Sequence, residues 1–194
     1  MKTVFCDIDT QMDFVYPAGA LYVPGAERIL PNVARLNRFA AENEFVLIST
    51  TDAHAENDPE FRHWPPHCVA GTFGQRKPEA TLLPHRVVIS SRPGDTVAPA
   101  GAQILLEKRE LDCFSNPNLN RILEQLGAAR CVVYGVVTEY CVRCAALGLL
   151  ALDKPVELVA DAVQTLREED GRRTIEEFLA AGGRLTTVEE VLAR

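Results

Sequence analysis

Short apolar runs along the chain alternate with segments in which apolar residues recur every three or four positions. The runs are rich in β-branched residues and predict strands at Thr3–Asp7, Phe45–Thr50, Arg86–Ser90, Gln103–Leu106, Cys131–Val136, Val156–Val159 and Arg184–Thr187. The spaced segments predict helices at Ile29–Ala40, Leu119–Leu126, Glu139–Leu152, Thr174–Ala181 and Val188–Leu192. Continuous apolar strands are typical of a parallel sheet that is covered on both faces. The pattern therefore predicts a three-layer α/β/α fold with a mostly parallel central sheet.

The interval from Thr51 to Ala102 is the exception, because it carries little periodicity beyond the predicted strand at Arg86–Ser90. It holds all four histidines of the chain and its single tryptophan, Trp64. Loops of this length are uncommon in a compact domain and are usually either functional or disordered. The clustered histidines favour a functional loop. We expect a single domain over residues 1–194, with a long metal- and substrate-binding loop at about 51–102.

Composition and charge exclude several classes of function. Of the 194 residues, 47% are hydrophobic and 24% are charged, as in ordinary globular proteins. The net charge of −7 argues against a nucleic-acid-binding role and against docking on anionic membranes. The first apolar run meets charge at Asp7, too early for a signal peptide, and the run Cys144–Leu152 is too short to span a membrane. We expect a cytoplasmic protein whose six cysteines are reduced.

Polar side chains directly follow four of the predicted strands. Asp9 follows the first strand, Asp52 and His54 follow the second, Lys108 follows the fourth and Cys141 follows the fifth. Ligands of open parallel sheets bind beyond the carboxyl ends of the strands. Taken singly, these residues also fit a turn cap, a surface lysine or an inert buried thiol. Their placement at one edge of one sheet favours a shared site.

Cys141 lies where a predicted strand turns into a predicted helix. Backbone N–H groups and the helix dipole at such a position lower the pKa of a thiol and can stabilise an oxyanion. A nearby Lys108 would favour the thiolate, and Asp9 could shuttle a proton. Together the three side chains suffice for acyl transfer. The C-x-x-C spacing of Cys141 and Cys144 leaves a redox dithiol as an alternative, which would not explain Asp9 or Lys108.

A second group of residues has the spacing of a metal site. Asp52, His54 and His67 can supply three ligands and leave open positions for water or substrate. The alternative is that they are loop residues that only form hydrogen bonds. Nitrogen and oxygen ligands of this kind suit one divalent zinc, iron or manganese ion, among which the sequence does not choose.

Five sequence features stand out together: D-T-Q-M-D-F (Asp9–Phe14), T-D-A-H-A-E-N (Thr51–Asn57), W-P-P-H-C-V-A-G-T (Trp64–Thr72), Lys108 and G-V-V-T-E-Y-C-V (Gly135–Val142). In these features, and over nearly its whole length, the chain resembles the isochorismatase-like cysteine hydrolase superfamily. Within that superfamily it is most similar to the nicotinamidases and pyrazinamidases. The resemblance implies a Rossmann-like α/β topology and hydrolysis of nicotinamide to nicotinate and ammonia through a cysteine thioester.

The resemblance also implies roles for individual residues. Cys141 would be the nucleophile, Asp9 the acid and base that activates it, and Lys108 the group that holds both in register. The Val136–Val137 peptide matches a cis bond of the family, which turns a backbone N–H toward an oxyanion hole shared with the N–H of Cys141.

The predicted ligands Asp52, His54 and His67 match the metal site of nicotinamidases, in which the ion orients the pyridine nitrogen of the substrate. Phe14 and Trp64 match the aromatic residues that flank the ring. The implied partner is a small amide, and the superfamily leans towards oligomers. After Lys108, however, the Tyr-Ser-x-Phe of nicotinamidases is replaced by R-E-L-D-C-F-S. This departure leaves open another C–N hydrolase of the superfamily, with a carbamoyl or ureido substrate.

Overall fold

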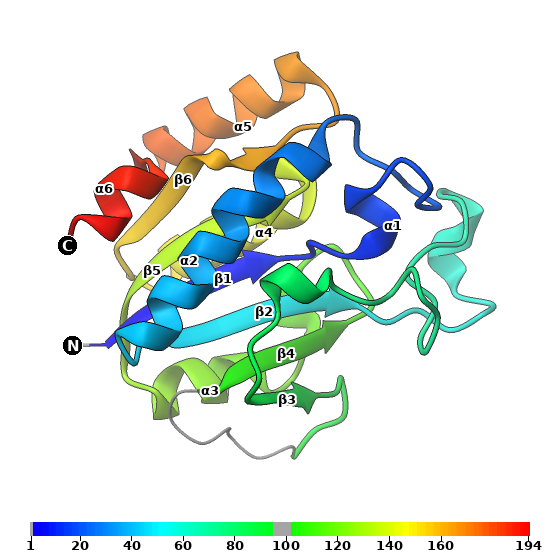
Figure 1. Cartoon of the computed structure of the whole chain (residues 1–194), viewed down its shortest axis with the longest axis horizontal. Coiled ribbons are helices and arrows are strands. Elements are labelled where there is room, and N and C mark those ends of the chain that lie inside the picture. The colour runs from blue at the N-terminus through cyan, green and yellow to red at the C-terminus, as the bar shows by residue number, and fades with distance from the viewer. Residues whose placement is uncertain (1, 95–101) are drawn as a thin grey trace.

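Seven parallel strands form one sheet within residues 2–94 and 102–194, the part of the chain that the computed structural model describes. Their order is β3-β4-β2-β1-β5-β6-β7, which places the N-terminal strand at the centre (Figure 1). The strands are β1 (Lys2–Ile8), β2 (Val46–Asp52), β3 (Arg86–Ile89), β4 (Gln103–Lys108), β5 (Ala128–Val136), β6 (Val156–Gln164) and β7 (Arg184–Thr186). All neighbouring pairs of strands are parallel. The predicted α/β fold with a parallel central sheet is confirmed.

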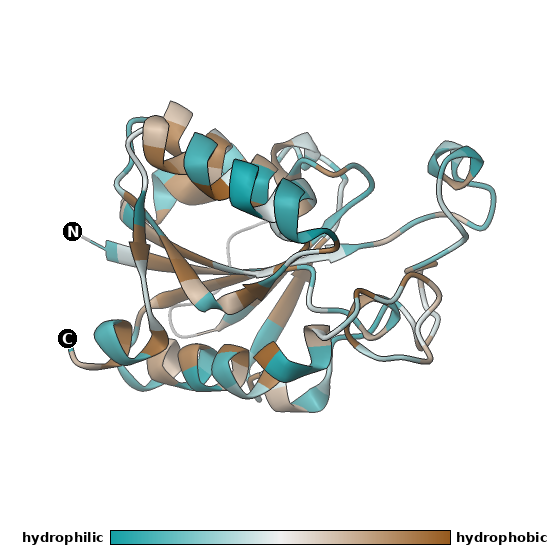
Figure 2. Ribbon diagram, turned by 90° about the horizontal axis from the view of Figure 1, so that it is seen from above, coloured by the Kyte–Doolittle hydropathy of each residue, from teal (hydrophilic) through white to brown (hydrophobic). Residues whose placement is uncertain are grey.

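Helices cover both faces of the sheet. They are α1 (Met12–Val15), α2 (Leu30–Glu42), α3 (Leu119–Gln125), α4 (Arg143–Ala151), α5 (Glu168–Ala180) and α6 (Val188–Leu192). Side chains of α2 and α6 pack in one apolar core, and side chains of α3, α4 and α5 pack in the other. In Figure 2 the apolar colouring gathers on the strands and on the helix sides that face them. Two cores on opposite faces of one sheet give the predicted three layers.

Alternation of side chains along each strand feeds both cores. In β1, Val4 and Ile8 join the core under α3 and α4, whereas Phe5 joins the core under α2. Every one of these side chains is at most 1% exposed. Burial of a large apolar side chain stabilises a fold by about 1.5–3 kcal/mol, so continuous apolar strands are favoured where both faces are covered.

Several element boundaries differ from those predicted. Helix α5 begins at Glu168 rather than at Thr174, because its first turn is acidic and exposed and so carries no apolar periodicity. Acidic side chains at that position interact favourably with the helix dipole. The predicted helix at Glu139–Leu152 is divided between a π-helical turn over Thr138–Val142 and helix α4, and the combined segment is buried on one side.

The loop at 51–102 crosses the carboxyl edge of the sheet and holds two short 3-10 helices, Pro59–Arg62 and Glu79–Thr81, in addition to β3. Residues 95–101 of the predicted loop lie outside the described residues. Within the described part of the chain, none of the helices combines the length and the apolar character that a membrane crossing requires.

Candidate active site

The carboxyl ends of four neighbouring strands bring the predicted site residues together. Asp9 follows β1, Asp52 ends β2 and Lys108 ends β4. Cys141 lies in the π-helical turn that joins β5 to α4. Because β4, β2, β1 and β5 are adjacent in the sheet, their ends form one continuous edge (Figure 1).

Lys108 is the centre of this arrangement and is completely buried. Its Nζ atom lies 2.8 Å from Oδ2 of Asp9, donates a hydrogen bond to Oδ1 of Asp52 and lies 3.6 Å from Sγ of Cys141. A further hydrogen bond of 3.0 Å goes to the carbonyl oxygen of Glu110. Burial opposes the charge of the ammonium group, but the two carboxylates outweigh it and hold the pKa of Lys108 well above its ordinary value.

Asp9 is held in an unusual backbone conformation, with a φ of 46°. The hydroxyl of Thr50 donates a 2.6 Å hydrogen bond to Oδ1 of Asp9 and accepts a 3.1 Å bond from its backbone N–H. Burial raises the pKa of the Asp9 carboxyl, but the charge and hydrogen bond of Lys108, together with Thr50, leave it below its ordinary value. Asp9 is therefore a carboxylate at neutral pH.

The thiol of Cys141 has a pKa well above its ordinary value. Burial is the largest cause; Lys108 lowers the pKa, whereas Asp9 and Asp52 raise it, and the thiol is hydrogen bonded to Asp9. The prediction that the lysine and the helix start would produce a thiolate is wrong for this state. The charge of Lys108 is shared by two carboxylates, so a proton remains on sulfur until a base removes it.

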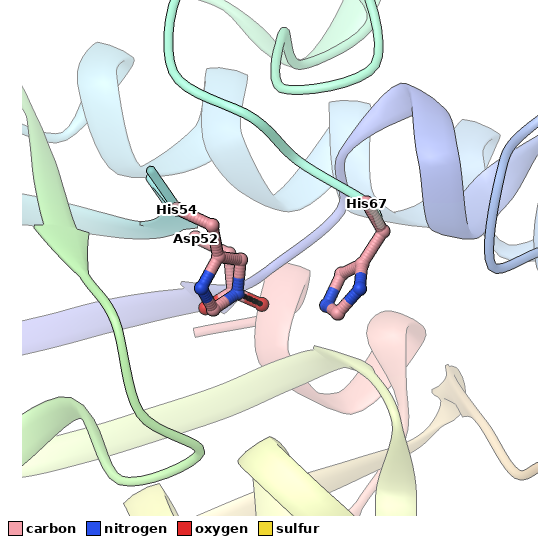
Figure 3. A group of neighbouring side chains, drawn as sticks. All are labelled: Asp52, His54 and His67. Carbon is pink, nitrogen blue, oxygen red and sulfur yellow. Dashed lines mark ion pairs between the residues drawn. The ribbon is translucent and has the colours of Figure 1, made fainter. Parts of the chain in front are cut away.

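A second cluster lies beside Asp9, Lys108 and Cys141. It consists of the side chains of Asp52, His54 and His67, which point toward one another (Figure 3). One potential ligand atom from each lies within 4.8 Å of the others. Both histidines are at most 2% exposed. Oδ2 of Asp52 lies 3.9 Å from Nε2 of His54, while Oδ1 is engaged by Lys108.

The hydrogen bonding of the two histidines fits a metal ion. Nε2 of His54 is buried and has no hydrogen-bond partner among the described residues, while Nδ1 of the same ring faces Oδ2 of Asp58 at 3.3 Å. Nδ1 of His67 lies 2.8 Å from the carbonyl oxygen of Pro65, which favours a proton on Nδ1 and leaves Nε2 as the ligand atom. Burial lowers the pKa of His67, which keeps the ring neutral, as metal binding requires.

Burial is also the main reason that the pKa of Asp52 rises to about 6, with Asp9 adding to it and Lys108 opposing it. A divalent cation beside Asp52 would favour its charged form. The buried carboxylate and two buried imidazoles are therefore a suitable ligand set for zinc, iron or manganese.

A mostly apolar pocket opens beside Cys141. Its wall includes Phe14 and Trp64, as predicted, together with Asp52, His67, Val136, Val137 and Cys141. The peptide bond between Val136 and Val137 is cis. Tyr140, which was not predicted, also lines the pocket, and its ring meets that of Trp64 edge-on at a centroid distance of 5.6 Å. Among the described lining residues, the carboxylates are Asp52 and Glu60, and no arginine or lysine is present.

The family model described as the Isochorismatase domain matches residues 3–190 of the chain. The chain belongs to the isochorismatase family. It is accordingly an isochorismatase-family hydrolase, and the predicted resemblance to that superfamily is confirmed.

Two curated relatives belong to different branches of chemistry. The nicotinamidase of Saccharomyces cerevisiae is 21% identical over 197 residues, which cover 87% of this chain and 90% of the relative. The N-carbamoylsarcosine amidase of an Arthrobacter species is 26% identical over 136 residues, 70% of this chain, but the match spans about half, 49%, of that relative. The chain is thus homologous to nicotinamidases at low identity.

Solved structures of the family have the same fold. The pyrazinamidase of Pyrococcus horikoshii in complex with zinc is 31% identical, covers 96% of this chain and 99% of its own, and superposes with a TM-score of 0.80. An isochorismatase-like hydrolase from Alkaliphilus metalliredigens is 26% identical, with a TM-score of 0.81 over 100% of this chain.

Sequence reasoning missed several residues around this isochorismatase-family site. Oδ2 of Asp58 lies 3.3 Å from Nδ1 of His54, and Oε1 of Glu60 lies 3.9 Å from Nε2 of His67. The side chain of Gln11 pairs with both the N–H and the C=O of Asp52, at 2.7 and 2.9 Å. Asp58 and Glu60 stand in the histidine-rich loop, but their spacing alone signals no role. Gln11 stands inside the quoted D-T-Q-M-D-F motif.

Proposed function

We propose that this hydrolase cleaves nicotinamide to nicotinate and ammonia through a thioester on Cys141. The observation that carries the proposal is the buried contact of Lys108 with Asp9 and Cys141, at 2.8 and 3.6 Å, beside an apolar pocket with aromatic walls. A nucleophile, a base and a cation in direct contact are the groups that acyl transfer requires.

The chemistry begins with the protonated thiol. Asp9, a carboxylate at neutral pH, takes the proton of Cys141 as sulfur attacks the carboxamide carbon. Lys108 keeps both groups in place and offsets the negative charge that passes between them. The family resemblance assigns the oxyanion to the backbone N–H groups of Val137 and Cys141, and both residues line the pocket.

The second half of the reaction reverses the proton transfers. Asp9 gives its proton to the leaving nitrogen, and ammonia departs as the thioester forms. Asp9 then takes a proton from a water molecule, whose oxygen attacks the thioester carbon. As nicotinate is released, Asp9 returns this proton to the Cys141 thiolate. Asp9 thus carries every proton that moves between the thiol, the leaving nitrogen and the attacking water.

Asp52, His54 and His67 would hold one divalent ion next to this path. When bound, such an ion supplies a Lewis-acid contact for the ring nitrogen of the substrate. Phe14 and Trp64 line the pocket and would provide apolar walls for the ring.

The charges of the pocket favour nicotinamide over the carbamoyl alternative. N-Carbamoylsarcosine and ureidoacrylate carry a carboxylate, and a buried carboxylate needs a cationic partner. The described pocket lining offers the carboxylates of Asp52 and Glu60 and no arginine or lysine. Lys108 is already engaged by two carboxylates, and in this proposal the ion at the Asp52, His54 and His67 cluster contacts the ring nitrogen of the substrate. An uncharged heteroaromatic amide meets no such repulsion. The redox alternative is less well supported for a different reason, because it gives no role to this pocket.

An ammonia-release assay tests the proposal on five compounds. We expect nicotinamide and pyrazinamide to be hydrolysed, and benzamide, which lacks the ring nitrogen, to be slower by roughly 5- to 150-fold, the value of one unmet polar contact. N-Carbamoylsarcosine and ureidoacrylate should react poorly. Turnover of only these two would establish the carbamoyl alternative, and equal rates for benzamide and nicotinamide would show that the ring nitrogen is not recognised.

A further inference from the structure

A second buried lysine lies close to the catalytic strand end but outside the pocket. The side chain of Lys77 is 1% exposed, and its Nζ atom lies 3.1 Å from Oδ1 of Asp7. Asp7 is in β1, two residues before Asp9, and is completely buried. The strand end thus carries two buried carboxylates, Asp7 paired with Lys77 and Asp9 paired with Lys108. The reaction proposed above gives no role to the first pair.

Thr10 connects this pair to Asp9. Its hydroxyl donates a 2.7 Å hydrogen bond to Oδ1 of Asp7 and accepts a 2.9 Å bond from Nζ of Lys77. Thr10 is completely buried and directly follows Asp9 in the chain. The position of the Thr10 side chain is therefore set by a lysine 67 residues further along the chain.

Asp7 in turn is held by a buried network of hydrogen bonds. Oδ2 of Asp7 accepts hydrogen bonds from Asn37 and from Ser49, at 3.1 and 3.2 Å. Asn37 accepts a 2.6 Å bond from the hydroxyl of Tyr134. Both carboxylate oxygens of Asp7 are thus engaged, and the network anchors Lys77 to β1, β2, β5 and α2.

Asp9 needs such an anchor because its φ of 46° is a conformation that side chains other than glycine rarely adopt. Thr50 holds the N–H and one carboxylate oxygen of Asp9. On the other side of the turn, the carbonyl oxygen of Asp9 accepts a 2.7 Å hydrogen bond from the N–H of Gln11. The Thr10 hydroxyl adds a second restraint there, because a rotation of the Asp9 backbone would strain its bonds to Asp7 and Lys77.

We propose that Lys77 is a positioning residue that acts through Thr10 to hold the left-handed turn at Asp9, and so aims the Asp9 carboxylate at Lys108 and Cys141. Lys77 touches neither the pocket wall nor the reacting groups. The kinetic test of this inference rests on the proposed function, and a second readout does not.

The sharpest variant is Thr10→Val, which keeps the shape of the side chain and leaves the direct pair of Lys77 and Asp7 in place. We expect kcat for nicotinamide to fall about 10- to 100-fold, as for a small misplacement of a catalytic group, while KM stays within about threefold. Thr10→Ser retains the hydroxyl and should remain within about threefold of wild type in both constants.

Thr81→Val is the matched control. Thr81 is an equally buried threonine on the same side of the sheet, and among the described residues its hydroxyl bonds only to the carbonyl of Pro78 in its own turn. The bond that Asn37 donates to Thr81 goes to its backbone carbonyl, which the substitution leaves in place. It should lower the melting temperature as Thr10→Val does without lowering kcat. If both valine variants lose kcat equally, or if Thr10→Val retains it, the positioning role is refuted.

A double variant tests Lys77 itself without leaving an unpaired buried charge. Lys77→Met alone leaves the Asp7 carboxylate buried without its cation and should be strongly destabilised. The double variant Asp7→Asn with Lys77→Met removes both charges and should recover melting temperature but not kcat. Recovery of kcat together with melting temperature would overturn the proposal.

The second readout is the rate at which iodoacetamide alkylates Cys141 at pH 7. The Asp9 carboxylate is hydrogen bonded to the thiol and takes its proton as sulfur attacks, so a displaced carboxylate should slow alkylation. Thr10→Val should react at least about threefold more slowly than wild type or Thr10→Ser. If wild type hydrolyses none of the amides, the proposed function fails, and these rates still decide the inference. Equal rates in all three proteins would refute it.

Discussion

The ammonium group of Lys108 lies 3.6 Å from the sulfur of Cys141, and yet the pKa of that thiol is raised. A lysine beside a cysteine ordinarily favours the thiolate. Here Asp9 and Asp52 compete for the same positive charge, and burial opposes any ionised sulfur. The nucleophile is thus stored as a thiol and becomes charged only when Asp9 accepts its proton.

Alkylation of Cys141 should therefore be slow at pH 7 and should accelerate with pH. Because the pKa of the thiol is raised, the thiolate fraction grows about tenfold for each pH unit below that pKa. The measurement is the rate of iodoacetamide labelling at Cys141 between pH 6 and pH 9, located by peptide mass spectrometry. A rate that is already at its plateau at pH 7 would show that the resting group is a thiolate.

Substitution of the nucleophile should abolish ammonia release. Cys141→Ala is expected to lower kcat by at least about 10³-fold, and Cys141→Ser by a similar factor, because an alkoxide is much harder to form than a thiolate. The matched control is Cys144→Ala, one helical turn away and half-buried, which should stay near wild type. An equal loss in Cys144→Ala would favour the dithiol alternative.

The cluster of Asp52, His54 and His67 should bind one metal ion per chain. The purified protein should contain close to one equivalent of zinc, iron or manganese by elemental analysis, and His54→Ala should lose most of it, because His54 offers a buried nitrogen with no other described partner. His63→Ala is the control, since His63 lies in the same loop but is exposed and outside the cluster. Unchanged metal content in His54→Ala would exclude this ligand set.

Removal of an aromatic side chain from the pocket wall should lower kcat/KM without changing the reactivity of the Cys141 thiol. Trp64→Ala is expected to lower kcat/KM about tenfold, in keeping with the roughly 0.5–1.5 kcal/mol of an aromatic contact. Alkylation of Cys141 at pH 7 should keep its wild-type rate. Phe73→Ala removes an aromatic side chain that is 66% exposed in a neighbouring loop, and it should leave kcat/KM unchanged. A similar loss in both variants would contradict a specific role for Trp64.

Alanine substitutions at Gly135 and Gly182 distinguish the destabilisation caused by steric overlap from that caused by backbone strain alone. A Cβ atom at Gly135, which has a φ of 121°, would lie 2.1 Å from the carbonyl oxygen of Ile8 in β1. Gly135→Ala should therefore lower the free energy of unfolding by about 2–4 kcal/mol, from overpacking and strain together. At Gly182, with a φ of 92°, nothing lies within 4 Å, so Gly182→Ala should lower it by only about 1 kcal/mol. Urea titration measures both, and equal losses would mean that the approach of β5 to β1 is not limiting.

The sequence predicted the parts of the site that follow directly from strand order. Asp9, Asp52 and Lys108 each come at the end of an apolar run, and parallel strands carry their ends to a common edge. It did not predict how the 51–102 loop folds back. That path depends on contacts such as the 2.7 Å bond from the Cys68 N–H to Asp13, which joins residues 55 positions apart and has no local pattern.

The sequence also failed on the charge state of Cys141, for a related reason. Lys108 and Cys141 are visible in the sequence as a favourable pair, but the sharing of one ammonium group between Asp9 and Asp52 appears only in three dimensions. Similarly, Lys77 looks like an ordinary loop lysine, and its buried pairing with Asp7 follows from tertiary packing alone.

The central position of β1 has a consequence for synthesis on the ribosome. Strand β1 is made first, and one of its two neighbours, β5, begins 120 residues after β1 ends, from Ile8 to Ala128. At about 5–20 residues per second, the nascent chain waits roughly 6–24 s with that edge of β1 unpaired. An unpaired apolar strand edge is a template for aggregation. The chain is therefore most in need of chaperone protection while the segment between β2 and β5 is being translated.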